Sequence, residues 1–65
     1  MKQYECLENI EVSDRYGDDT KIEKGSKWKF DNYDANNKFN LMVDDDDKVI
    51  KITDYEFVRY FKEVV

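Results

Sequence analysis

Hydrophobic and polar residues alternate along much of the chain, and this pattern indicates strands that bury one face. Within residues 2–12, the apolar residues of one parity are Tyr4, Cys6, Ile10 and Val12. This period of two predicts a first strand. Glu8 interrupts the apolar row, so we expect a bulge or bend near Glu8 and Asn9.

Residues 13–26 read as a long excursion that follows this strand. The segment begins with aspartates and Gly17, which favour turns. Thr20 and Ile22 predict a short strand within it. Residues 24–26 predict a tight turn in which Gly25 adopts a positive φ angle.

Three further stretches predict a meander of antiparallel strands at residues 27–30, 38–43 and 48–52. Polar loops at residues 31–37 and 44–47 separate them. The side chains expected to face the core alternate along each strand: Trp28 and Phe30, then Phe39, Leu41 and Val43, then Ile50 and Ile52. Lys27 and Lys29 should therefore face solvent.

A C-terminal helix has the clearest start signal in the sequence. Thr53 and Glu56 have the spacing of a capping box, and Ile52 and Phe57 that of a hydrophobic staple. The apolar residues that continue at helical spacing are Phe57, Tyr60, Phe61 and Val64. We therefore expect a helix that begins after Thr53 and continues through Val64, with Lys62 near its negative end.

The predicted element order indicates one mainly β domain over residues 1–65, with one C-terminal helix. A strand, a long loop, three meandering strands and a short helix are the layout of a small Src-homology-3-like barrel of about five antiparallel strands. The chain is 42% charged, but its 15% aromatic residues argue against disorder.

Composition argues against catalysis and cofactors. The chain has a single cysteine, Cys6, so it has no internal disulfide. It has no histidine, so it offers neither a histidine ligand for zinc nor a base that would activate the cysteine as a nucleophile. The parity of Cys6 places it in the core instead. Carboxylate pairs are abundant, but side chains fill a barrel this small and leave no cleft for acid–base chemistry. We expect no enzyme, no catalytic residue, no cofactor and no metal site.

The setting we expect is the cytoplasm. No stretch approaches the roughly 20 apolar residues that span a bilayer. A lone cysteine fits a reducing compartment. An open barrel leaves unpaired edge strands that can join two copies, so a monomer or a weak homodimer is expected.

Three stretches carry a resemblance to a known group: Tyr4–Cys6, Ile22–Trp28 and Tyr60–Val64. Together they resemble short, acidic proteins of bacteriophages and mobile elements of Gram-positive bacteria. The resemblance covers most of the chain, and it implies a small accessory protein that works by binding. It implies no functional residues, because no activity is established for that group.

The run Asp44–Asp47 dominates the distribution of charge. It fails as an EF-hand, because Val49 stands where the loop needs glycine and Tyr55 where it needs a bidentate glutamate. A net charge of −5 repels nucleic acid directly but attracts basic proteins. Our hypothesis is an acidic surface that imitates nucleic acid and inhibits a basic, nucleic-acid-handling host or defence protein, as an anti-CRISPR or anti-restriction factor does. The partner-binding residues are expected to be Asp44, Asp45, Asp46 and Asp47, followed by Asp18 and Asp19.

Other interpretations compete with this hypothesis. The alternative is a structural or adaptor module that contacts a protein through exposed aromatics such as Tyr16, Tyr33 and Tyr55. Lysines around Trp28 suggest a single-strand binding platform, but an inward Trp28 has no free ring face for stacking. Acidity that serves solubility alone is the simplest explanation for any single carboxylate.

Overall fold

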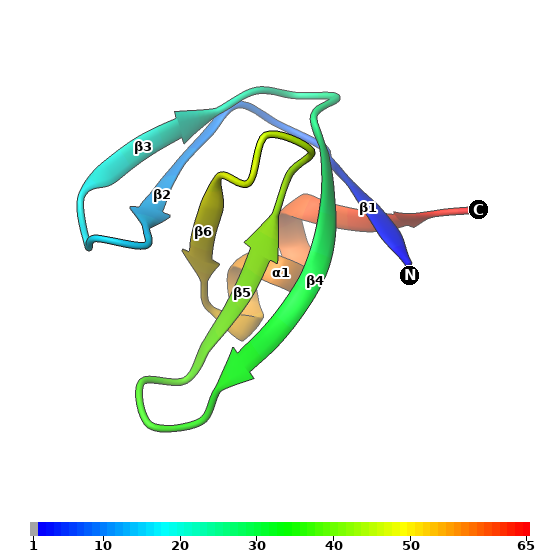
Figure 1. Ribbon diagram of the computed structural model, residues 1–65. Helices are drawn as coiled ribbons and strands as arrows, with labels where there is room; N and C mark the ends of the chain where they lie inside the picture. Colours follow the sequence, from blue (N-terminus) through cyan, green and yellow to red (C-terminus); the bar gives the residue numbers. More distant parts are fainter. Residues whose placement is uncertain (1) are drawn as a thin grey trace.

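The computed structural model describes residues 2–65 and shows one antiparallel sheet of seven strands (Figure 1). In chain order, the elements are β1 (Gln3–Cys6), β2 (Ile10–Asp14), β3 (Asp19–Ile22), β4 (Lys27–Asp34), β5 (Phe39–Val43), β6 (Val49–Ile52), α1 (Asp54–Tyr60) and β7 (Phe61–Val64). The strands lie side by side in the order β3-β2-β6-β5-β4-β1-β7. The sheet curls, and α1 lies behind it in Figure 1.

The prediction of a mainly β fold with a short C-terminal helix is confirmed. The structure has two more strands than the roughly five expected of a small barrel. The edge strands β3 and β7 do not pair with each other, so the described sheet is open. Closure into a barrel is therefore not observed among residues 2–65.

The first predicted strand is divided into β1 and β2. The break falls at residues 7–9, which confirms the bend expected near Glu8 and Asn9. Hydrogen bonds to the segment before β4 hold the bend: the Asn9 side-chain oxygen accepts from the Lys24 amide at 2.8 Å, and the Cys6 amide donates to the Ser26 carbonyl at 2.9 Å. Because of this break, β1 and β2 pair with different strands: β1 lies between β4 and β7, and β2 lies between β3 and β6.

The excursion at residues 13–26 is a β2–β3 hairpin followed by a tight turn. The short strand expected around Thr20 and Ile22 is present as β3. Gly25 has a φ of 90°, as predicted, and its amide donates to the Cys6 carbonyl at 2.7 Å. The turn thereby aligns the start of β4 with β1.

Strand β4 continues beyond its predicted end. Residues 31–34 were expected in a loop, but they belong to β4, and the register with β5 shifts between Phe30 and Asn32. This bulge leaves Asp31 unpaired. Only residues 35–38 form the turn, which ends at Lys38 with a φ of 59°. Phe30, expected in the core, lies at its margin and is 36% exposed.

Strand β5 buries the face opposite to the predicted one. Asn40 and Met42 are buried, whereas Phe39, Leu41 and Val43 are only half-buried. The cause is the register with β6, in which Met42 lies opposite Ile50 and Asn40 opposite Ile52. Directly opposite residues share a face, and Ile50 and Ile52 are fully buried, as expected.

The helix begins as predicted and ends early. Both hydrogen bonds of the Thr53–Glu56 capping box are present. The helix stops at Tyr60, because Phe61 has extended dihedral angles and starts β7, which pairs with β1. The expected helical turn through Val64 is therefore wrong, and Lys62 lies on a strand. Arg59 is the basic residue in the last turn.

One hydrophobic core lies between the sheet and the helix. Its buried residues are Cys6, Val12, Ile22, Trp28, Met42, Ile50, Ile52 and Phe61. Cys6 is fully buried, which confirms its placement in the core, and this burial raises the pKa of its thiol. The buried Asn40 amide is satisfied, since it donates to the Asp54 carboxylate at 2.8 Å and to the Ile52 carbonyl at 3.3 Å. Asn40 therefore ties the start of α1 to β5.

Candidate functional site

The predicted partner-binding aspartates lie in two hairpin loops. We call two segments together the acidic rim: residues 14–19, which are the β2–β3 turn with the strand residue on each side of it, and residues 44–48, between β5 and β6. Asp18, Asp19, Asp45, Asp46 and Asp47 are exposed, and Asp44 is half-buried.

The two loops of the acidic rim share one local geometry. The Asp14 carboxylate accepts from the amides of Tyr16 at 2.8 Å and Asp18 at 3.0 Å. The Asp44 carboxylate accepts from the amides of Asp46 and Lys48, each at 2.9 Å. These Asx turns are what aspartate at the first turn position favours. Asp14 and Asp44 therefore stabilise their own turns. The exposed aspartates that follow them are available to contact a partner.

The fold places the two loops next to each other. Antiparallel pairing sets Asp14 of β2 opposite Ile50 of β6, so the loop that follows β2 adjoins the loop that precedes β6. The Arg15 guanidinium donates to the Asp47 carbonyl at 3.1 Å. Residues of both loops also line a shallow recess of about 350 Å³. In the sequence, the aspartates of one loop lie 25 or more residues from those of the other, and only the β2–β6 pairing brings them together.

The acidic rim holds the entire net charge of the protein. It contains seven aspartates against two cations, Arg15 and Lys48, which leaves five negative charges. The rest of the chain has nine acidic and nine basic residues and is neutral. Lys29 of β4 approaches Asp45 at 3.6 Å, but the Asp45 side chain remains 81% exposed. An exposed pair of this kind contributes little to stability, and Lys29 offsets one of the negative charges next to the rim. The acidity is thus localised and not spread evenly.

Asp47 is the strained residue of the acidic rim. Its φ of 64° lies in the left-handed region, where the matching position of the other loop has Gly17 at 83°. We predict that Asp47→Gly stabilises the protein by about 0.5 kcal/mol, because relief of roughly 1–2 kcal/mol of strain exceeds the added freedom of the unfolded chain. Urea unfolding measures the change.

Asp46→Gly is the matched control for this substitution. It removes the same charge from the same loop, but the φ of Asp46 is not positive. It should therefore destabilise the protein by about 0.4–1 kcal/mol through the unfolded chain alone. Equal effects of the two substitutions would show that charge, and not backbone strain, determines the stability of this loop.

Across residues 2–65, no three histidine, cysteine, aspartate or glutamate side chains are grouped so that they can hold a metal ion. Within the same range, none of the helical structure has the length and apolar character that a membrane span needs.

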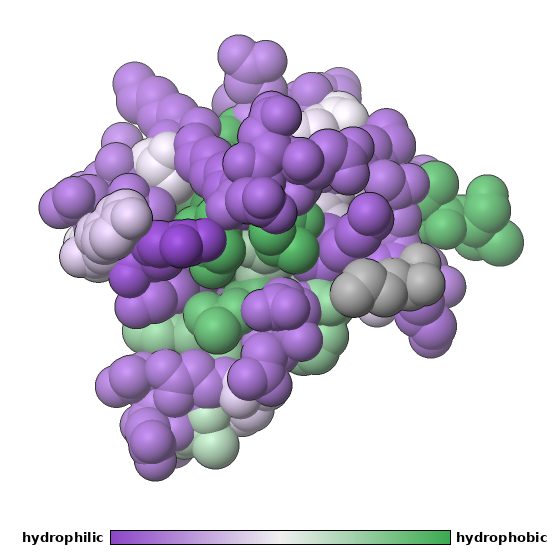
Figure 2. Space-filling view, viewed as in Figure 1, coloured by the Kyte–Doolittle hydropathy of each residue, from purple (hydrophilic) through white to green (hydrophobic). Residues whose placement is uncertain are grey.

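A second surface was missed by sequence reasoning. Phe39, Leu41 and Val43 of β5 lie on the outer face of the sheet, and Val49 of β6 is opposite Val43. We call these four residues the outer stripe. Figure 2 shows hydrophobic residues gathered over β5 and β6 in the middle of this face, within hydrophilic surroundings. The sequence signal was present as apolar residues on both parities of 39–43, but alternation alone assigned the wrong parity to the core.

The aromatic residues proposed for the alternatives fall into two groups. Tyr16, Tyr55 and Tyr33 are 80%, 68% and 40% exposed, and they come from three different parts of the fold, the acidic rim, α1 and β4. Trp28 is only 3% exposed, and its indole N–H donates to the Ser26 hydroxyl at 2.9 Å. The inward orientation of Trp28 is confirmed, and this removes the stacking platform that single-strand binding needs.

Comparison of the chain with protein-family models, with curated proteins and with solved structures finds no match.

Proposed function

We propose that this protein is a non-catalytic binding domain whose acidic rim engages and inhibits a basic protein that handles nucleic acid. The observation that supports the proposal is the localisation of charge: two neighbouring loops hold five net negative charges, and the remainder of the chain is neutral. Solubility alone requires no such localisation, because charge spread over the surface serves it equally well.

The physical mechanism is competition for a cationic channel. A cluster of exposed carboxylates attracts the lysines and arginines that normally bind phosphates, and it accelerates encounter at low salt. The two loops present their exposed aspartates on turns anchored by Asp14 and Asp44, so the charges are held in place before binding. Such preorganisation lowers the entropic cost of association.

The finer fold and setting belong to the same proposal. The meander β4–β5–β6 and the hairpin β2–β3 support the proposal that the sheet is a Src-homology-3-like barrel with its last seam unpaired. A phage-type accessory protein of this kind acts in the host cytoplasm, where its targets are nucleases, defence effectors and polymerases.

The test is capture from a bacterial lysate with three baits. The rim variant Asp18→Lys/Asp46→Lys changes one aspartate in each loop, and neither side chain accepts a hydrogen bond or ion pair among the described residues. The control variant Glu8→Lys/Asp31→Lys makes the same change in net charge at exposed positions outside the rim. Circular dichroism establishes that all three baits are folded.

We expect the wild type and the control to retain nucleic-acid-binding proteins that the rim variant loses. Duplex DNA or high salt should elute these proteins, because ionic competition weakens exposed charge contacts. The activity of the captured enzyme should fall as the domain is added. Equal retention by the rim and control variants, or retention that DNA does not reduce, contradicts the proposal.

A second candidate is an adaptor module, and the outer stripe favours it. Exposed apolar area within a polar surround marks protein-binding surfaces, and an apolar contact resists salt. Leu41→Lys on the stripe should then abolish capture that survives high salt, while the rim variant should not affect it. The two candidates are therefore separated by the same set of washes.

A further inference from the structure

The outer edge of β3 is an open sheet edge with regularly placed charges. β3 is the terminal strand of the sheet, and its Asp19 and Lys21 are exposed on one face. Antiparallel ladders alternate between bonded and non-bonded residue pairs. The Asp14 amide donates to the Asp18 carbonyl at 2.8 Å, so alternation directs Thr20 toward β2 and the backbone groups of Asp19 and Lys21 outward.

We propose that two copies of this chain pair through β3, antiparallel about a two-fold axis at Thr20. In this register Asp19 of each copy lies opposite Lys21 of the other, and their outward backbone groups bond to each other. Moving the axis to Asp19 or to Lys21 sets like charges opposite each other, which destabilises a strand pair. The charge pattern therefore selects a single register.

Charges beside the edge support the same register. Glu11 of β2 lies opposite Lys21 within the chain. Across the pair, the side chains of Glu11, Lys21 and the second copy's Asp19 then lie side by side on three neighbouring strands, and their charges alternate in sign. The central Thr20 residues face each other, and threonine pairs are favourable in antiparallel sheets.

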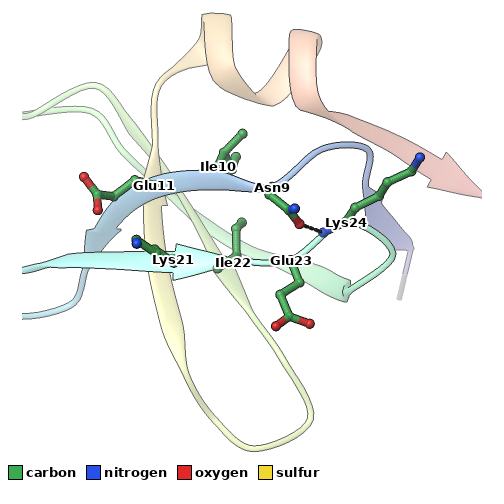
Figure 3. A pocket seen from close by; sticks show the side chains of 7 residues that line it. All are labelled: Asn9, Ile10, Glu11, Lys21, Ile22, Glu23 and Lys24. Carbon is green, nitrogen blue, oxygen red and sulfur yellow. Dashed lines mark hydrogen bonds between the residues drawn. The ribbon is translucent and has the colours of Figure 1, made fainter.

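A groove next to the edge receives the loop of the second copy. It has a volume of about 640 Å³, and Figure 3 shows Ile10 and Ile22 projecting to the same side of the β2–β3 hairpin. Lys21 and Lys24 also line it. The proposed register sets Tyr16 of the second copy opposite Lys24 and Asp18 opposite Ile22, so the Tyr16 side chain, which is 80% exposed, lies beside this groove.

The opposite edge of the sheet lacks this complementarity. Just before β7, the Leu7 amide donates to the Tyr60 carbonyl, so alternation directs the backbone groups of Phe61 and Glu63 away from β1. Antiparallel pairing of two β7 strands about Lys62 sets Glu63 opposite Phe61, whose side chain is buried. The second copy therefore joins at β3, and the 44–48 loop of the acidic rim stays outside the pair.

Sedimentation equilibrium over a concentration series tests the proposal. Wild type should approach twice its monomer mass of 7.9 kDa as concentration rises. Lys21→Asp and Asp19→Lys should each lose the dimer, and an equimolar mixture of the two variants should recover it, because every cross-pair is again Asp opposite Lys. Lys62→Asp is the matched control, since Lys62 lies opposite Glu5 on the other edge as Lys21 lies opposite Glu11.

The outcomes are decisive in both directions. Restoration of the dimer on mixing, together with slowed amide exchange at Asp19 and Lys21, establishes the β3 register. A wild type that stays at the monomer mass throughout overturns the proposal. A dimer that survives both single variants, or that Lys62→Asp removes, overturns it as well.

Discussion

Met42→Ala is expected to destabilise the protein by about 2–4 kcal/mol, which is the usual cost of deleting a long buried side chain. Met42 is fully buried between β4 and β6, opposite Phe30 on one side and Ile50 on the other. A domain of this size has a stability of only about 5 kcal/mol or slightly more. The variant should therefore unfold at a much lower urea concentration, as measured by tryptophan fluorescence of Trp28.

Leu41→Ala is the matched control for this prediction. Leu41 is the neighbouring residue on the same strand, but its half-buried side chain faces outward. Its loss should cost about 1 kcal/mol or less, because it leaves no enclosed cavity. If Leu41→Ala were the more damaging of the two substitutions, β5 would bury the face that simple alternation suggested.

Phe61→Ala is expected to cost about 3–5 kcal/mol, the range for a buried phenylalanine. Phe61 is 5% exposed, lies opposite Cys6 in the β1–β7 pair, and has its ring centre 6.4 Å from that of Phe57. Its removal therefore weakens the aromatic group at the end of α1 and the attachment of β7 to the sheet. Thermal unfolding followed by circular dichroism measures the loss.

Val58→Ala provides the comparison for Phe61. Val58 lies on α1 and is 82% exposed, so its truncation should change stability by less than about 0.5 kcal/mol. Hydrogen exchange adds a second readout, because loss of β7 should expose amides of β1 that pair with it. Comparable costs for Phe61→Ala and Val58→Ala would mean that the C-terminal segment does not pack as described.

Local signals in the sequence predicted local structure well. The capping box at Thr53 and the left-handed turn at Gly25 both depend on hydrogen bonds or dihedral angles within a few residues. The strand around Thr20 and the burial of Cys6 follow from the alternation of apolar and polar residues over a few positions. In these cases the structure of a segment depends on the residues of that same segment.

The errors arose where two local patterns compete. Residues 39–43 have apolar side chains on both parities, so periodicity alone does not select a face. Residues 61–64 fit a helical stripe and also a strand, and β1 offers a partner strand that extends them. Residues 31–34 look like a loop by composition, yet β5 pairs with them once a bulge has corrected the register.

By itself, the sequence determined the composition of the acidic rim, the absence of histidine and the turn chemistry of Asp14 and Asp44, because these depend on residue type and short spacing. The tertiary structure alone decided that the two loops adjoin, that Leu41 faces outward and that β3 ends the sheet. Strand pairing joins residues that are distant in sequence, and its register is fixed by the best burial available to the whole sheet. No single segment contains that information.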